Sequence, residues 1–199
     1  QLGVTSPKTS GFGKGWAGNV LELALGATAG SKQGPDFPRL GVELKSIPVG
    51  PDGRPRESTW VTTVELLHGH ALTWETSHVR AKLARVLWIP LLTDRGVAPA
   101  DRIVGGPLLW SPSAAQEAAI RADWQDLMEL VVLGRAEEIT AKMGDVLQIR
   151  PKGQRASSRV IGIGTDGHRT AVAPRGFYLR ASFTRSILAA GFGSPGPSG

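Results

Sequence analysis

The sequence predicts an α/β (α+β) fold in which helices flank a mixed β-sheet. Two observations support this: segments of helical periodicity alternate with segments of strand periodicity, and 41% of the 199 residues are hydrophobic, which is enough for a buried core. The expected order is a helix, two strands, a helix, a strand, a long helix, a strand, a hairpin and a closing helix. The length predicts one domain over residues 1–193, and the Gly, Pro and Ser residues of 194–199 predict a disordered tail.

The first part of the chain is expected to form a helix followed by two paired strands. Residues 16–29 would be a helix that is apolar on nearly every side, whereas residues 40–47 alternate apolar and polar side chains as a strand does. Pro48 should end this strand. A turn at 51–53 would lead into a second strand at 59–64, which forms a hairpin with the first.

The middle of the chain should contain two helices separated by extended segments. Thr76 or Ser77 is expected to cap a short helix, residues 86–92 read as a strand, and residues 103–110 are partly extended. Residues 111–112 then open the clearest helix, which should stop near the next glycine, at position 134. Its buried face should consist of Ile120, Trp124, Leu127 and Val131.

The last part is expected to contain three strands and a helix. Residues 146–149 read as a strand, and Asp166 with Gly167 as a turn. Residues 170–173 and 177–180 would form a hairpin around residues 174–176, and residues 182–190 would form the closing helix.

One short stretch carries an acid, a second acid and a lysine, namely Asp36, Glu43 and Lys45. Side chains two apart on a strand share a face, so Glu43 and Lys45 should project together, and Asp36 could fold back onto that face. Two carboxylates can hold a hard divalent cation, and a lysine beside them can bind phosphate or steady a water. This is the minimal set for metal-dependent phosphodiester cleavage. The alternative is an exposed strand with a solvated Glu–Lys pair.

Glu22 is the one charged residue between positions 15 and 31. A carboxylate in such an apolar helix is costly to bury unless it is paired, and a metal ion or a nearby lysine could be its partner. Alternatively, Glu22 lies at the wet edge of a core helix.

The positive charge of the chain is concentrated in its last quarter. Residues 146–199 hold eight Lys or Arg and one acid, whereas residues 1–145 hold fifteen basic and sixteen acidic side chains. Such asymmetry is typical of a protein that binds a polyanion, although an incidentally basic surface is the alternative. Cysteine is absent, which excludes a thiolate metal site, and no apolar run or secretory signal indicates a membrane or export, so a cytoplasmic location is expected.

These residues closely resemble the MutH family, the strand-nicking endonucleases of methyl-directed DNA mismatch repair. The similarity covers most of the chain, from Lys14 to Phe183, in long unbroken blocks that are far more specific than the two acids and the lysine. Such blocks include Leu40-Gly41-Val42-Glu43-Leu44-Lys45, Trp74-Glu75-Thr76-Ser77-His78-Val79-Arg80, Leu147-Gln148-Ile149-Arg150-Pro151-Lys152 and Pro174-Arg175-Gly176-Phe177-Tyr178-Leu179.

The resemblance implies a fold like that of type II restriction endonucleases, with two lobes that form a DNA cleft. The catalytic lobe would lie mainly in 14–92 and the DNA-reading region mainly in 146–185. The implied activity is Mg²⁺-dependent incision (one or two ions) of the unmethylated strand at hemimethylated GATC sites. The implied partners are double-stranded DNA, MutL as activator and, indirectly, MutS. The protein would act as a monomer in the bacterial cytoplasm.

The resemblance also assigns roles to individual residues. By position, the catalytic residues are Glu22, Asp36, Glu43, Lys45 and Lys82. The expected metal ligands are Glu22, Asp36 and Glu43, and the carbonyl of Leu44, which lies between the two catalytic side chains, could supply another oxygen. The residues expected to bind DNA are Lys14, Gly15, Arg150, Pro151, Lys152, Gly153, Arg175, Tyr178 and Arg180, and the basic groups of the last quarter that do not read bases would bind phosphate.

Among these, Arg150, Pro151 and Lys152 match the base-reading loop, and Tyr178 matches the residue that senses adenine methylation. From the residues alone, Lys82 could instead be a solvated lysine and Tyr178, the sole tyrosine, a half-buried strand aromatic.

Two departures from the family pattern bear on activation by MutL. The helical segment that usually precedes Gln1 is missing, and the tail from Ser194 lacks the apolar end that is expected. Two other functions compete with the repair enzyme. One is a GATC-specific restriction endonuclease of related fold that acts without MutL. The other is a DNA-binding module without catalysis, which is disfavoured because Asp36, Glu43 and Lys45 are all present.

Overall fold

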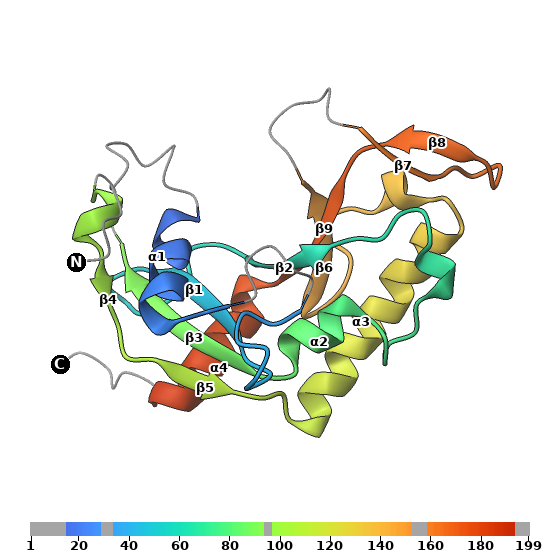
Figure 1. Cartoon of the computed structure of the whole chain (residues 1–199). Helices are drawn as coiled ribbons and strands as arrows, with labels where there is room; N and C mark the ends of the chain where they lie inside the picture. Colours follow the sequence, from blue (N-terminus) through green and yellow to red (C-terminus); the bar gives the residue numbers. More distant parts are fainter. Residues whose placement is uncertain (1–14, 29–33, 94–96, 153–158, 194–199) are drawn as a thin grey trace. The chain divides into compact units, whose positions relative to one another are not determined.

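The computed structural model describes residues 15–28, 34–93, 97–152 and 159–193, and it confirms the mixed α/β fold class (Figure 1). The chain divides into two compact units. Unit 1 contains residues 1–57, 82–111 and 184–199, and unit 2 contains residues 58–81 and 112–183. The tail predicted for 194–199 lies outside the described residues.

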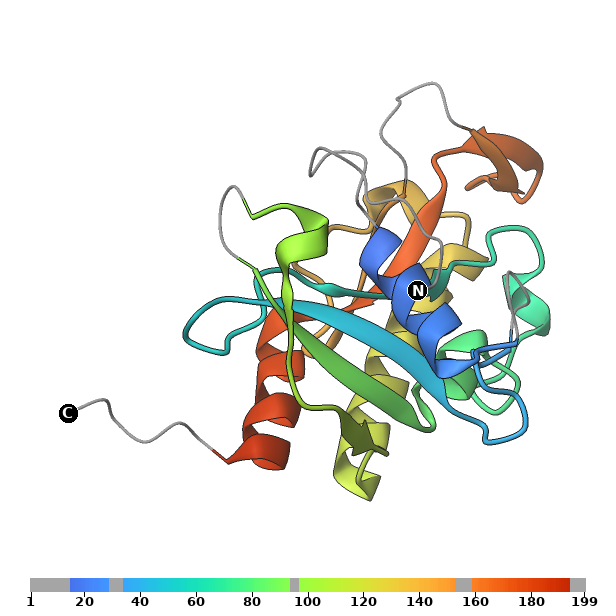
Figure 2. The same ribbon diagram turned by 60° about the vertical axis from the view of Figure 1, so that its left-hand side comes forward.

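Unit 1 is built on a four-stranded sheet. β1 (Glu43–Val49) pairs in parallel with β3 (Val86–Leu92), and β4 (Ile103–Val104) and β5 (Leu108–Trp110) pair with β3 in antiparallel orientation. α1 (Trp16–Leu25) lies on one face of the β1–β3 sheet, and the unit 1 part of α4 (Ala181–Phe192) lies on the other (Figure 2). The strand predicted at 86–92 is confirmed. β1 runs through Pro48, which an edge strand tolerates.

The core of unit 1 under α1 is formed by alternate residues of β1 and β3. Leu44, Ile89 and Leu91 are buried there, and Ala17 and Leu21 of α1 pack on them. The prediction of a long helix at 16–29 was wrong in its extent. The helix ends at Leu25, because Gly26 adopts a left-handed conformation (φ 75°) and caps it. No α1 residue is fully buried, since only one face of the helix meets the sheet.

Unit 2 is built on a three-stranded antiparallel sheet with β9 (Arg175–Leu179) at its centre. β2 (Thr59–Thr63) pairs with one side of β9 and β6 (Leu147–Pro151) with the other. β7 (Val160–Ile163) and β8 (Arg169–Val172) form a separate hairpin.

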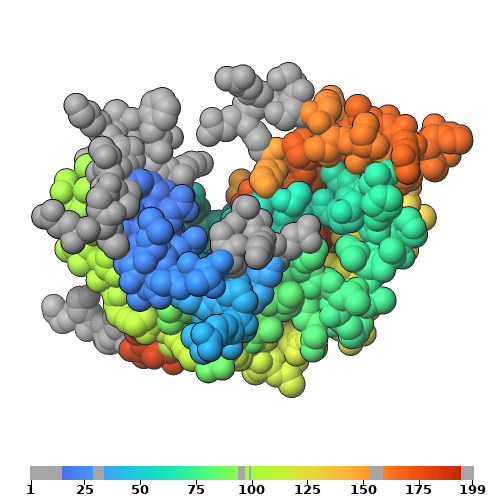
Figure 3. Space-filling model, in the orientation of Figure 1, coloured from blue at the N-terminus to red at the C-terminus, as the bar shows by residue number. Residues whose placement is uncertain are grey.

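Unit 2 also includes the β7–β8 hairpin and the first part of a short helix, α2. The β7–β8 hairpin is joined to the segment after β2, where Ile163 N–H donates to the Leu66 carbonyl at 3.1 Å, and the two segments lie side by side on the surface (Figure 3). α2 (His78–Leu83) begins in unit 2 and ends in unit 1. Its cap is as predicted, because Ser77 Oγ accepts from Arg80 N–H at 3.1 Å.

Two hairpins were predicted, one joining residues 40–47 to 59–64 and one joining 170–173 to 177–180. Both predictions were wrong in the strand partner. The turn at 51–53 forms, with Gly53 at φ 68°, but β2 then leaves β1 and pairs with β9. β8 pairs with β7 across the Asp166–Gly167 turn and not with β9. In both cases the turn residues fix only a local reversal, whereas the buried sides of the strands fix which sheet they join.

The long helix α3 (Ala114–Val132) matches its prediction closely. Ser113 forms a capping box with Gln116, and all four residues that were predicted to face the core are buried. The helix stops before Gly134, whose φ is 72°. Across the described ranges, no helix is both long enough and apolar enough to cross a membrane.

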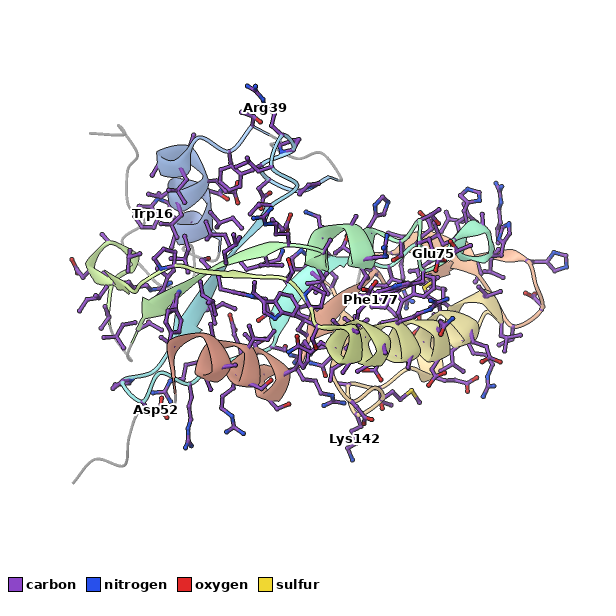
Figure 4. All side chains as sticks on the ribbon, turned by 90° about the horizontal axis from the view of Figure 1, so that it is seen from below. Trp16, Arg39, Asp52, Glu75, Lys142 and Phe177 are labelled. Carbon is purple, nitrogen blue, oxygen red and sulfur yellow. The ribbon has the colours of Figure 1, made fainter. Side chains whose placement is uncertain are left out.

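Asp123 of α3 holds the loop that precedes β6. Its carboxylate accepts from the backbone N–H groups of Asp145 (2.9 Å), Val146 (2.7 Å) and Leu147 (2.8 Å). From the other side, Arg180 Nε donates to the Gly144 carbonyl at 2.7 Å. The loop is therefore fixed through both its amides and its carbonyls, while its exposed side chains, such as Lys142, point outward (Figure 4).

Replacement of Asp123 by Ala should destabilise the protein by about 3 kcal/mol, because three backbone amides, of which that of Leu147 is buried, lose a charged acceptor. The free energy of unfolding can be measured by urea denaturation. Asp126→Ala is the matched control, since Asp126 is an exposed residue on the same helix. Equal losses for the two variants would show that Asp123 has no special role in holding the loop.

Candidate active site and basic surface

The candidate active site lies in unit 1 and is centred on Glu43. β1 places Glu43 and Lys45 on one face of the sheet, as predicted, and Lys45 Nζ lies 2.7 Å from Glu43 Oε1. The side chains of Glu43 and Lys45 are only 3% and 11% exposed. The alternative of a solvated pair on an open strand is therefore wrong.

Lys82 reaches the same carboxylate from α2. Its Nζ lies 2.9 Å from both Oε1 and Oε2 of Glu43 and 3.3 Å from the carbonyl of Gly34. Lys82 is 14% exposed, so it is not a solvated surface lysine. Because a buried carboxylate is costly unless it is paired, the two ammonium groups of Lys45 and Lys82 make the burial of Glu43 tolerable.

Asp36 folds back onto β1, as the sequence predicted. Phe37 and Val42 form an isolated antiparallel bridge, and Gly41 supplies the positive φ (63°) that the intervening turn requires. This reversal brings Asp36 Oδ2 to 2.8 Å from the backbone N–H of Leu44. Asp36 is thereby tied to the residue between Glu43 and Lys45.

The remaining acid, Glu22, is partly buried on α1 and shares an electrostatic field with this group. Burial raises the pKa of Glu22, and the negative charges of Asp36 and Glu43 raise it further against the opposing effect of the two lysines. Burial likewise raises the pKa of Asp36, and Glu43 adds to this effect, while the Leu44 N–H and both lysines lower it. The fold thus holds carboxylates where their negative charge is unfavourable, which is typical of a site for cations or substrate.

The chemistry of the donors fits a hard divalent cation. All candidate ligands are oxygens, from the carboxylates of Glu22, Asp36 and Glu43 and the carbonyl of Leu44, and such ligands suit Mg²⁺ rather than a soft metal. Within the described ranges, no three His, Cys, Asp or Glu side chains are arranged to hold a metal by themselves. Mg²⁺ does not need such a cage, because it usually binds one or two carboxylates and completes its shell with water and substrate phosphate.

A basic surface in unit 2 combines two cations with two aromatic rings. Arg150 of β6 donates to Ser58 Oγ at 2.7 Å, and its guanidinium lies 5.7 Å from the centre of the Tyr178 ring. Lys152 Nζ lies 4.5 Å from the centre of the Trp60 ring. The rings of Trp60 and Tyr178 meet edge to face at 5.2 Å. The structure therefore brings Arg150 and Tyr178 together on one sheet, with Lys152 directly after the end of β6.

Trp60 is a member of this surface that sequence reasoning missed. The error followed from pairing β2 with β1, which placed Trp60 far from Tyr178. The signal that could have found it is Gly176, which lies beneath the Trp60 ring. A Cβ at position 176 would come within 2.0 Å of that ring, so only glycine leaves room for it.

The other predicted DNA-binding residues differ in their surroundings. Arg175 is 4% exposed and donates to the carbonyl of Ile139, and Arg180 donates to loop carbonyls, so the geometry favours structural roles for both. Pro151 is exposed beside Arg150, and Gly15 is an exposed residue that precedes α1. Lys14 and Gly153 lie outside the described residues.

Comparison with known proteins identifies one family. The family model "DNA mismatch repair enzyme MutH" matches residues 25–123. DNA mismatch repair proteins MutH from Salmonella typhimurium, Salmonella typhi and Salmonella enteritidis are each 51% identical to the chain over 192 residues. Each alignment covers 96% of the chain and 83% of the relative.

The raised pKa of Asp36 leads to a prediction about stability. The folded protein binds this proton more tightly than the unfolded chain, so ionisation of Asp36 opposes folding as the pH rises above about 4. Asp36→Asn should therefore raise the free energy of unfolding at neutral pH, by about 0.5 kcal/mol because solvent screens a partly buried group.

The gain should shrink as the pH falls and disappear below about pH 3, where Asp36 is protonated in both the folded and the unfolded state. Urea denaturation in EDTA over this pH range measures it without interference from metal. Asp126→Asn on α3 is the control, because Asp126 is exposed. A gain that does not depend on pH would contradict the assignment of the effect to the charge of Asp36.

Proposed function

Because the chain belongs to the MutH family of DNA mismatch repair enzymes, we propose that it nicks the unmethylated strand at hemimethylated GATC sites with Mg²⁺ as its cofactor. Membership of this family makes the chain a DNA-cleaving endonuclease and implies a divalent metal cofactor. The observation that carries the proposal is the buried Glu43, held by Lys45 and Lys82 and tied through Leu44 to Asp36.

The proposed mechanism divides the work between the carboxylates and the lysines. Asp36, Glu43, Glu22 and the Leu44 carbonyl would hold the metal, which when bound lowers the pKa of a water and offsets charge on the phosphorus. Lys45 orients the attacking water or stabilises the negative charge that develops on the phosphate oxygens. Lys82, whose Nζ donates to the carboxylate of Glu43, binds a phosphate oxygen and positions the scissile bond.

Recognition of DNA is assigned to the basic surface of unit 2. Arg150 and Lys152 can both reach hydrogen-bond acceptors on guanine in the major groove. The rings of Tyr178 and Trp60 hold these cations in place, so their positions depend on one another. Tyr178 distinguishes adenine from N6-methyladenine, through crowding by the ring or a displaced contact of its hydroxyl.

The proposed partners follow from mismatch repair. MutL activates the enzyme, MutS acts indirectly through MutL, and the enzyme works as a monomer in the bacterial cytoplasm. The second candidate is a GATC-specific restriction endonuclease, which would have the same active site and would cut without MutL. A DNA-binding module without catalysis is disfavoured, because all five predicted catalytic side chains are present and three of them are in direct contact.

The deciding experiment uses a plasmid with a single GATC site. The site is prepared unmethylated, hemimethylated or fully methylated, and the protein is incubated with each in Mg²⁺, with and without MutL. The proposal expects a nick in the unmethylated strand, none at the fully methylated site, and stimulation by MutL. Cleavage of both strands that does not respond to MutL would favour the restriction endonuclease.

The role of Glu43 can be tested by the substitution Glu43→Gln. The nicking rate should fall by at least about 10²-fold, because a metal ligand and the charge that positions both lysines are lost. DNA binding in Ca²⁺ should be retained or strengthened, since a negative charge is removed near the phosphate. Glu57→Gln, at an exposed position in unit 1, is the control. A folded Glu43→Gln variant that nicks normally at saturating Mg²⁺ would refute the mechanism.

The role of Tyr178 can be tested by comparing Tyr178→Ala with Tyr178→Phe. Tyr178→Ala should reduce the ratio of nicking rates on hemimethylated and fully methylated sites by about 10-fold, because the crowding by the ring is relieved. Tyr178→Phe keeps the ring contacts with Trp60 and Arg150 and isolates the hydroxyl. If neither variant alters the ratio, methylation is sensed elsewhere.

A further inference from the structure

Arg175 is the buried arginine of the DNA-binding sheet. Although it lies in the basic last quarter of the chain, its side chain is 4% exposed and its guanidinium is directed into unit 2. NH1 donates to the carbonyl of Ile139 at 3.2 Å, and NH2 donates to Oε2 of Glu137 at 3.3 Å. A guanidinium that is buried and bound to these partners is unable to bind DNA directly. Its role lies instead in the contacts that it makes with Ile139 and Glu137.

Glu137 connects three segments of the chain through one carboxylate. Besides Arg175 at the start of β9, it accepts from the backbone N–H of Ala173 at 3.1 Å, in the link after β8. Its Oε1 also lies 3.8 Å from Arg159 NH1, just before β7. The N–H of Ala173 lowers the pKa of Glu137, and the charges of Arg175 and Arg159 lower it further, so the carboxylate is ionised at neutral pH. Glu137 thus fixes the point where the β7–β8 hairpin joins β9.

The same short segment also holds the strands that carry the basic surface. Lys152 N–H donates to the Pro174 carbonyl at 2.7 Å, and Val64 N–H donates to the Arg175 carbonyl at 2.9 Å. The next residue is Gly176, on which the Trp60 ring rests without space for even a methyl group. Any displacement of residues 173–175 would therefore move Lys152 and disturb the packing of Trp60 against Tyr178.

We propose that Glu137 and Arg175 are positioning residues that set the discrimination of sequence and methylation without touching DNA. The inference rests on the proposed function, because it assumes that Arg150, Lys152 and Tyr178 read the site. The pair acts through the backbone of β9, whose position determines where the cations and rings of the basic surface stand. Small displacements of such groups are costly, since recognition depends on geometry at the scale of about 1 Å.

Glu137→Gln is the test variant, because it removes the charge that binds Arg175 and Arg159 while it keeps the size of the side chain. Two ratios of nicking rates are measured, with protein checked for folding by thermal denaturation. One compares GATC with a site changed at one base, and the other compares hemimethylated with fully methylated GATC. Both ratios should fall by about 10-fold, while the rate at hemimethylated GATC falls much less.

Glu138→Gln provides a closely matched control. Glu138 is the next residue in the same short helix and is also ion-paired, but its partner is Arg135 (NH2 at 2.6 Å) and not a residue of β9. Its variant should keep both ratios of the wild type. Glu137→Asp, which retains the charge, should keep more of the discrimination than Glu137→Gln.

The outcomes separate this inference from the proposed function. If the wild type itself shows no preference for GATC, the proposed function fails. If the wild type discriminates and Glu137→Gln has the same ratios, the positioning role is overturned, even where the variant is less stable or slower overall. Should Glu137→Gln not accumulate as folded protein, Arg175→Lys decides, because a lysine cannot make the two-armed contact with the Ile139 carbonyl and Glu137. Unchanged ratios in that variant overturn the role.

Discussion

The burial of Glu43 is the constraint on which the candidate active site depends. A carboxylate that is 3% exposed can be retained only beside positive charge, and the fold supplies it from two separate elements. Lys45 follows from strand periodicity, whereas Lys82 requires α2 to end against the start of β1. The parallel pairing of β1 with β3, which directly follows α2, makes this placement possible. The pairing of Glu43 with Lys82 thus ties the end of α2 to the start of β1.

The second constraint is the central position of β9 in unit 2. β2 and β6 are far from each other in sequence, and only their shared pairing with β9 brings Trp60, Arg150 and Tyr178 onto one surface. The cations lie beside aromatic rings and not in water alone, which limits the directions in which they can reach. Because β9 carries both Gly176 and Tyr178, a shift of this strand would affect the whole surface.

The sequence was sufficient for features that depend on neighbouring residues. The capping of α3 and α2, the buried face of α3 and the shared face of Glu43 and Lys45 all follow from local periodicity and hydrogen bonding. The pairing of strands did not follow from local sequence, because the turn residues at 51–53 and 174–176 are compatible with more than one partner strand. Trp60 was missed for the same reason, and Arg175 resembled a DNA contact because composition records charge but not burial.

Arg175 at the start of β9 and Arg180 just after its end show why charge in a sequence is an incomplete guide to a binding surface. Arg175 and Arg180 contribute to the basic last quarter, yet the Nη atoms of Arg175 bind Glu137 and the Ile139 carbonyl, and Arg180 binds carbonyls of the loop before β6. Arg150 and Lys152 contribute the same charge but remain exposed, with aromatic rings beneath them. Arg175 and Arg180 hold the backbone of the sheet and of the loop beside it, whereas Arg150 and Lys152 present charge on its surface. Under the proposed function, specificity requires both pairs, because a cation can read a base only from a position that the fold holds fixed.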